Sequence, residues 1–119
     1  MTDRYLIPIR TYSTLNQRVH WAVRAKRTKA EREAVRACCL GIKPLRGSAV
    51  VTLVRVAPRG LDDDNLAASF KACRDQLALM LGLPDDRDPR VVWRYGQRRG
   101  AVREYGIDIV VERRVEVAA

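Results

Sequence analysis

The residues of this chain best suited to chemistry are three consecutive aspartates, Asp62, Asp63 and Asp64, followed by Asn65. In an extended segment, alternate side chains share a face. We therefore expect Asp62 and Asp64 to point the same way, where two carboxylates can converge on a divalent cation. A purely structural interpretation stays open, because Asp64 is also a good N-cap for a helix that begins at this point.

A second acidic cluster, Asp85-Asp86-Arg87-Asp88, follows in a loop bounded by Pro84 and Pro89. Asp and Pro favour turns, so a simple polar turn is one interpretation. The loop must nevertheless return to the sheet before an apolar segment at 91–97. If that segment neighbours the strand before the triplet, Asp86 can approach the first cluster.

Lys71 and Asp75 lie between the two clusters and are four residues apart, which makes them neighbours on one face of a helix. Lys71 could stabilise negative charge that develops on a phosphate. The alternative is an ordinary solvated ion pair, which contributes little to stability.

Charge is distributed unevenly along the chain. The net charge is +9, and 19 of the 23 basic residues are Arg, whose planar fork pairs with phosphate through two hydrogen bonds. Segment 62–88 holds seven of the nine Asp and carries −4, whereas the remainder carries +13. An acidic island in a basic molecule suggests a cation presented to a phosphodiester. A composition that merely reflects Arg-rich codon usage is the alternative.

Length and composition favour one domain spanning residues 1–119. No apolar run approaches the roughly 18 residues that cross a bilayer, and no signal peptide is visible, so we expect a cytoplasmic protein without membrane contact. The three cysteines include no CxxC motif and are expected to be small core residues.

The periodicity of apolar residues predicts an α/β (α+β) fold, a small mixed sheet of about four strands with two main helices packed on one face. Thr28-Lys29-Ala30-Glu31 has the spacing of a capping box and predicts a helix start. Gly100 suggests that the last two strands form a hairpin. The strands are expected at 5–10, the first of them at an edge, 48–56, 91–97 and 103–111, and the helices at 28–40 and 65–81.

Four segments together resemble the RusA-like family of Holliday junction resolvases, and most closely its phage and prophage branch. They are Leu61-Asp-Asp-Asp-Asn65, Lys71-Ala-Cys-Arg-Asp75, Leu81-Gly-Leu-Pro-Asp-Asp-Arg-Asp88 and Val92-Trp-Arg-Tyr-Gly-Gln97. The resemblance covers residues 48–111. Over residues 1–47 only Asn16 is similar to the family pattern, as a counterpart of its N-terminal Asn.

The resemblance implies a homodimeric endonuclease that binds four-way DNA junctions and cuts symmetrically related strands with Mg²⁺, or Mn²⁺ in its place. Asp62, Asp64 and Asp86 match the family's metal-binding carboxylates. Lys71 matches its catalytic lysine, although the family places that lysine at the position that Ala68 occupies here.

The predicted function is therefore metal-dependent, structure-selective cleavage of Holliday junctions in DNA recombination and repair, in a bacterial or phage-infected cell. Arginines near the C-terminal strands are expected to follow the DNA phosphates. They are Arg94, Arg98, Arg99 and Arg103. Two alternatives stay open, a non-catalytic DNA-binding dimer with the same fold and a nuclease that acts on flaps or replication intermediates.

Overall fold

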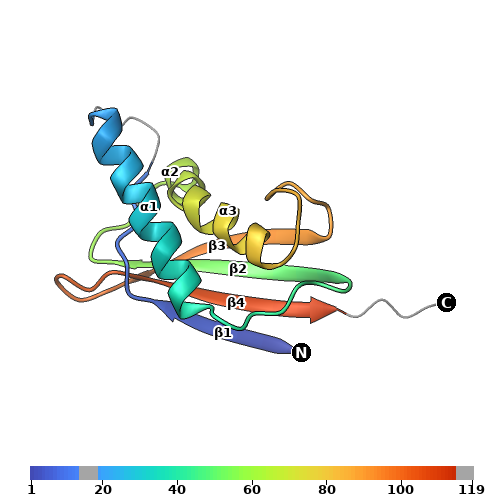
Figure 1. The fold of residues 1–119 in the computed structure, drawn as a ribbon. Helices are drawn as coiled ribbons and strands as arrows, with labels where there is room; N and C mark the ends of the chain where they lie inside the picture. The colour runs from blue at the N-terminus through green and yellow to red at the C-terminus, as the bar shows by residue number, and fades with distance from the viewer. Residues whose placement is uncertain (14–18, 115–119) are drawn as a thin grey trace.

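The computed structural model describes residues 1–13 and 19–114 and shows an α+β domain with a four-stranded mixed sheet in the order β1-β4-β2-β3 (Figure 1). The elements in chain order are β1 (Thr2–Ile7), α1 (Trp21–Cys38), β2 (Ser48–Ala57), α2 (Asp63–Ser69), α3 (Lys71–Met80), β3 (Val91–Arg99) and β4 (Gly106–Arg114). All three helices cover the same face of the sheet, which confirms the predicted layers. β1 lies at one edge and ends before Pro8, a residue without a main-chain N–H.

β2 is the central strand because its β-branched and apolar sequence is buried along most of its length. It pairs in parallel with β3 and antiparallel with β4. The predicted hairpin between the last two strands is therefore wrong. β3 and β4 flank β2, and residues 100–105 connect them around its end, where the N–H of Gly100 donates to the carbonyl oxygen of Ala57 at 2.9 Å. A long buried strand needs hydrogen-bonded partners on both edges. For β2 these partners are β3 on one edge and β4 on the other.

The first helix begins earlier than predicted, at Trp21, with His20 as its N-cap. Thr28 and Glu31 lie in the middle of this helix and form no capping box. The segment before Thr28 is rich in Ala, Arg and Lys, which are strong helix formers, and nothing in it stops the helix. The capping-box spacing thus occurs here without a helix end.

The helix predicted over 65–81 is in fact two helices, α2 and α3, which meet at Phe70. The Ser69 hydroxyl donates to the carbonyl oxygen of Leu66 at 2.6 Å and competes with the main-chain ladder. The Phe70 side chain is fully buried and stacks on Tyr95 of β3, with ring centroids 5.7 Å apart. The break therefore lets an aromatic ring at the junction enter the core.

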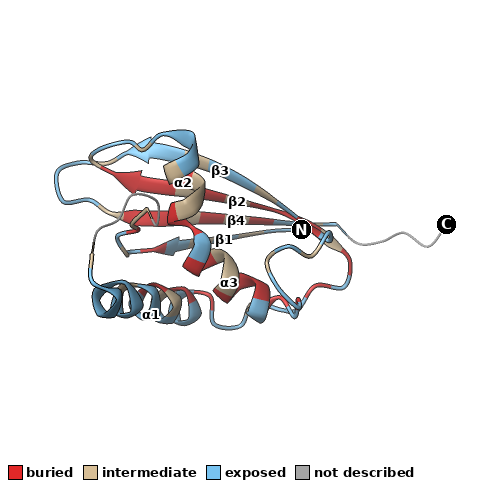
Figure 2. Ribbon diagram, turned by 90° about the horizontal axis from the view of Figure 1, so that it is seen from above, coloured by how far each residue is buried: buried red, intermediate tan, exposed pale blue. Residues whose placement is uncertain are grey.

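The core lies between the sheet and the helices (Figure 2). Leu53 and Ile109 from the sheet and Leu77 from α3 are fully buried. Cys39 and Cys73 are core residues as predicted, whereas Cys38 is exposed on the outer side of α1. Among residues 1–13 and 19–114, no helix combines the length and apolar character that crossing a membrane requires.

Candidate active site

The acidic triplet forms the start of α2. Asp62 is the N-cap, and its Oδ1 accepts hydrogen bonds from the Asn65 N–H at 2.9 Å and from Asn65 Nδ2 at 2.7 Å. These bonds, the main-chain one first, lower the pKa of the Asp62 carboxyl. Ser13 in turn donates to Asn65 Oδ1. Asp62 caps the helix, and the prediction that Asp64 does so is wrong.

The predicted extended geometry of the triplet is also wrong. Asp63 and Asp64 already belong to the first turn of α2. Only Asp62 has an extended backbone, so the alternation of faces along an extended segment does not apply to Asp62 and Asp64. All three carboxylates are exposed to solvent.

The triplet is held against the sheet by Gln97, near the end of β3. Gln97 Oε1 accepts from the Leu61 N–H at 2.9 Å, and Gln97 Nε2 donates to the Leu61 carbonyl oxygen at 2.8 Å. This two-way clamp fixes the main chain directly before Asp62. A glutamine in an exposed strand position gives no sequence signal for such a role.

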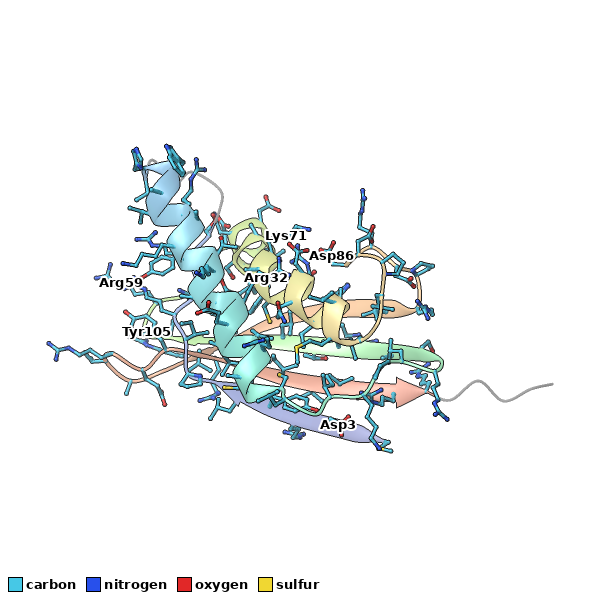
Figure 3. The ribbon with its side chains drawn as sticks, in the orientation of Figure 1. Asp3, Arg32, Arg59, Lys71, Asp86 and Tyr105 are labelled. Atoms are coloured by element: carbon cyan, nitrogen blue, oxygen red, sulfur yellow. The ribbon has the colours of Figure 1, made fainter. Side chains whose placement is uncertain are left out.

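Lys71 and Asp86 lie together at the start of α3 (Figure 3). Lys71 Nζ is 3.1 and 3.0 Å from the two carboxylate oxygens of Asp86 and 3.0 Å from Asp75 Oδ1. Arg74 Nε adds a further hydrogen bond to Asp86 Oδ2 at 3.1 Å. Trp93 Nε1 donates to the Asp86 carbonyl oxygen at 2.8 Å and anchors the loop to β3. The predicted Lys71–Asp75 pair is confirmed, and Asp86 joins it.

Both partners of the Lys71–Asp86 contact are charged at neutral pH. Burial would raise the pKa of Asp86, but the hydrogen bonds from Lys71 and Arg74 outweigh burial and lower it. Burial likewise opposes the charge on Lys71, and the bonds to Asp75 and Asp86 raise its pKa. The Asp86 side chain is only 8% exposed, whereas that of Lys71 is 51% exposed. The side chains of Lys71 and Asp75, the latter 35% exposed, are thus the parts of this cluster that lie nearest to solvent.

The three carboxylates predicted to bind metal are not gathered into one group. Across the described residues, 1–13 and 19–114, no three His, Cys, Asp or Glu side chains are placed to hold a metal ion. The Asp62 side chain caps its own helix by accepting from the Asn65 N–H. The Asp86 side chain accepts hydrogen bonds from Lys71 and Arg74. The residues in this arrangement do not fit a metal centre. Asn16 lies outside the described residues.

The four predicted DNA-binding arginines are all exposed but do not share one face. Arg94 and Arg98 pair with Thr52 and Val56 of β2, and so lie on the sheet face opposite the helices. Arg98 Nη2 also binds Asp108 Oδ2 at 2.9 Å. Arg99 follows on the other face of the strand, and Arg103 lies in the connection to β4 with a φ of 65°.

Two residues near Lys71 were missed by sequence reasoning. Arg74 lies one turn after Lys71, and that spacing could have identified it. Glu31 of α1 is 7% exposed and lines a small hollow of about 90 Å³ together with Lys71 and Asp75. Its Oε1 has no hydrogen-bond partner among the described residues, and burial raises its pKa to about 8.

Comparison with known proteins gives no assignment, since no protein-family model matches the chain and no curated protein matches it.

Proposed function

We propose that this protein binds branched DNA through its phosphates and cuts it as a structure-selective endodeoxyribonuclease, with the four-way junction as its substrate, in the cytoplasm of a bacterial or phage-infected cell. The observation that carries the proposal is the contact of Lys71 with Asp86. The resemblance to RusA-like resolvases assigns catalytic roles to both residues. They are fifteen positions apart in the chain, yet Lys71 Nζ lies 3.0 Å from Asp86 Oδ2.

The charge pattern supports the same proposal. A net charge of +9 attracts a polyanion such as DNA. The acidic segment 62–88 would supply carboxylates next to the bound DNA. In this proposal the half-exposed side chain of Lys71 neutralises charge on a phosphate undergoing attack. A second copy of the chain would present a second, symmetry-related site to the paired strands of a junction, so the proposal includes a homodimer.

Mg²⁺, or Mn²⁺ in its place, enters this proposal through the resemblance alone. In the fold described here, Asp62, Asp64 and Asp86 do not form a metal-holding group. The proposed roles of the chain's own residues are therefore limited to phosphate binding by the arginines, charge neutralisation by Lys71 and the placement of exposed carboxylates at the start of α2.

One observation favours a second candidate, a non-catalytic DNA-binding dimer. Lys71 and Arg74 both form ion pairs with Asp86. A nearly buried carboxylate with two cationic partners stabilises the fold, and this role requires no catalysis. A protein that kept this cluster for folding would bind junctions without cutting them.

Cleavage of a labelled four-way junction, in Mg²⁺, in Mn²⁺ and in EDTA, distinguishes the two candidates. The resemblance predicts that the wild type cuts only with a divalent ion. Asp64→Asn should bind the junction with unchanged affinity and lose cleavage by at least about a hundred-fold, as is common when a catalytic group is removed. Asp63→Asn, its exposed neighbour, is the matched control and should cut normally.

Wild-type protein that binds the junction tightly but leaves it intact in both metals would overturn the nuclease proposal in favour of the binding dimer. A flap substrate tested in parallel separates junction resolution from flap cleavage, because the preferred substrate is cut at the lower protein concentration.

A further inference from the structure

A hollow of about 370 Å³ opens at the carboxyl ends of the parallel strands β2 and β3. Its polar lining is almost entirely cationic and consists of Arg55, Arg59, Gln97, Arg98 and Arg99. Carboxyl ends of neighbouring parallel strands are a common place for ligands in sheets with helical cover. None of the acidic clusters contributes a carboxylate to this hollow.

Arg55 is the unusual member of this lining. It follows Val51 and Leu53 on the helix-covered face of β2 and is only 8% exposed. Its Nε donates to Thr11 Oγ1 at 3.1 Å, and its Nη1 donates to the Arg59 carbonyl oxygen at 2.8 Å. Both acceptors are neutral, and within residues 1–13 and 19–114 no carboxylate pairs with Arg55.

A buried guanidinium without a counter-ion is costly, since burial disfavours its charge and nearby cations add repulsion. Burial first, and then the neighbouring Arg10, lower the pKa of Arg55, and Tyr105 opposes them. Arg98 is paired with Asp108, but Arg59 and Arg99 form no ion pair within the described part of the chain. The site therefore has an excess of positive charge that an anion would satisfy.

We propose that this hollow is a phosphate-binding site in which Arg55 is the buried anchor and Arg59 and Arg99 are the outer contacts. An arginine fork suits the oxygens of a phosphate, and the two neutral acceptors hold the Arg55 fork in place before a ligand arrives. The same chemistry would accept free phosphate or a phosphate of a nucleic-acid backbone.

The location of the hollow points to the backbone phosphate, an assignment that rests on the proposed function. Gln97 lines the hollow and forms two hydrogen bonds with the main chain of Leu61. The acidic triplet begins at the next residue, Asp62, and is therefore adjacent to the hollow in the chain. Gly60 also lines the hollow. It leaves space for the side chain of Gln97, because a Cβ at position 60 would lie 3.3 Å from Gln97 Oε1. A phosphate held here would fix the DNA strand beside Asp62 and Asp64.

The test uses two ligands, inorganic phosphate and a four-way junction, with three variants. Arg59→Gln is the main variant because Arg59 is exposed and its bond to Arg55 is made by its main-chain oxygen. Arg55→Met removes the anchor, and thermal unfolding shows whether it still folds. Arg46→Gln is the matched control, an exposed arginine just before the opposite end of β2.

Inorganic phosphate should bind the wild type and Arg46→Gln equally, as followed by titration calorimetry in a phosphate-free buffer. Binding to Arg59→Gln should be about ten-fold weaker, because a hydrogen bond between charged groups is lost. For the junction, Arg59→Gln should weaken binding to a similar degree. The slope of log affinity against log salt should fall by about 0.9 relative to wild type.

The two proposals fail in different ways. If the junction binds and Arg59→Gln matches Arg46→Gln with both ligands, the phosphate site is wrong and the DNA-binding proposal stands. If phosphate binds in an Arg59-dependent manner and the junction does not bind at all, the phosphate site stands and the DNA-binding proposal is wrong.

Discussion

Lys71, the first residue of α3, donates to both carboxylate oxygens of Asp86, at 3.1 and 3.0 Å. This contact connects the loop before β3 to the helix layer. Arg74 reinforces the contact from the next turn of the helix, at 3.1 Å. Because Asp86 is nearly buried, its charge must be balanced there for the loop to keep this position. Asp86 is thus a structural residue of this loop.

Replacing Asp86 by Asn should lower the free energy of unfolding by about 1–3 kcal/mol at pH 7, because Arg74 is then left partly buried without its carboxylate. The half-exposed Lys71 adds little to this value. Urea denaturation measures the change. Asp85→Asn is the control, since Asp85 is half-exposed and its ion pair with Arg87 is 3.6 Å long. An asparagine also keeps the oxygen that accepts from the Arg87 N–H at 2.7 Å. Equal stability of the two variants would contradict the assigned role.

The stabilisation by Asp86 should also disappear in acid. Its pKa is lowered in the folded protein because the bonds from Lys71 and Arg74 outweigh burial. Such a group contributes stability above its unfolded pKa of about 4, and that contribution is lost as the pH falls through the folded value. The stability difference between wild type and Asp86→Asn should therefore be constant from neutral pH down to about 5 and shrink below that.

The cap and the charge of Asp62 can be separated by two substitutions. Asn is as good an N-cap as Asp, so Asp62→Asn should keep the thermal midpoint of the wild type, whereas Asp62→Ala should lower it. Under the proposed function, both variants should lose junction cleavage. A calorimetric scan and a cleavage assay on the same preparations test this. If Asp62→Asn cuts as well as wild type, Asp62 serves only as a cap.

The sheet was predictable from the sequence to the extent that its strands have a strong apolar pattern. The segment 48–56 reads as a buried central strand, and β2 is one. The pairing of β3 and β4 was not predictable, because a glycine between two strands is equally compatible with a hairpin and with a connection around a third strand. Partner choice depends on β2, which lies far away in the chain.

Within the candidate site, the contact local to one helix was predictable, and the tertiary contacts were less so. The spacing of Lys71 and Asp75 gave their ion pair, because that contact is local to one helix. The break at Phe70 depends on the burial of its ring against Tyr95, a tertiary contact that overrides helix propensity. Arg55 reads as one charged position in an apolar strand, and only the surrounding arginines reveal an excess of charge.

Glu31 should make folding stability depend on pH in the neutral range. Burial raises its pKa to about 8, against about 4.3 in the unfolded chain. The contribution of Glu31 to the free energy of unfolding is complete below about pH 4.3. It declines as the pH rises towards the folded pKa, because Glu31 ionises at a lower pH in the unfolded state than in the folded protein. Glu31→Gln removes this decline. It should gain stability relative to wild type between pH 5 and 8, by at most about 1.4 kcal/mol per pH unit.

Urea denaturation of wild type and Glu31→Gln at several pH values measures the gain. Glu33→Gln, an exposed position on the same helix, is the control and should run parallel to wild type. Parallel curves for Glu31→Gln would show that Glu31 ionises freely in the folded protein.

Gly100 should be required for the path that joins β3 to β4 around the end of β2. A Cβ at this position would lie 2.8 Å from Glu104 Oε1, 3.0 Å from the Glu104 carbonyl oxygen and 3.1 Å from Val56 Cγ1. The Glu104 side chain can move, but the carbonyl belongs to the turn itself and Val56 is buried in the central strand. Gly100→Ala should therefore lower the free energy of unfolding by about 1–3 kcal/mol through overpacking.

Gly96→Ala, four residues earlier on β3, is the matched control. Its added methyl group would meet only Val54 Cγ2, at an ordinary contact distance of 3.6 Å. Because alanine also restricts the unfolded chain more than glycine, Gly96→Ala should leave stability unchanged or raise it by up to about 1 kcal/mol. Urea denaturation of the two variants in parallel measures both effects. If Gly100→Ala is as stable as Gly96→Ala, the connection does not pass as tightly around β2 as the contacts of Gly100 indicate.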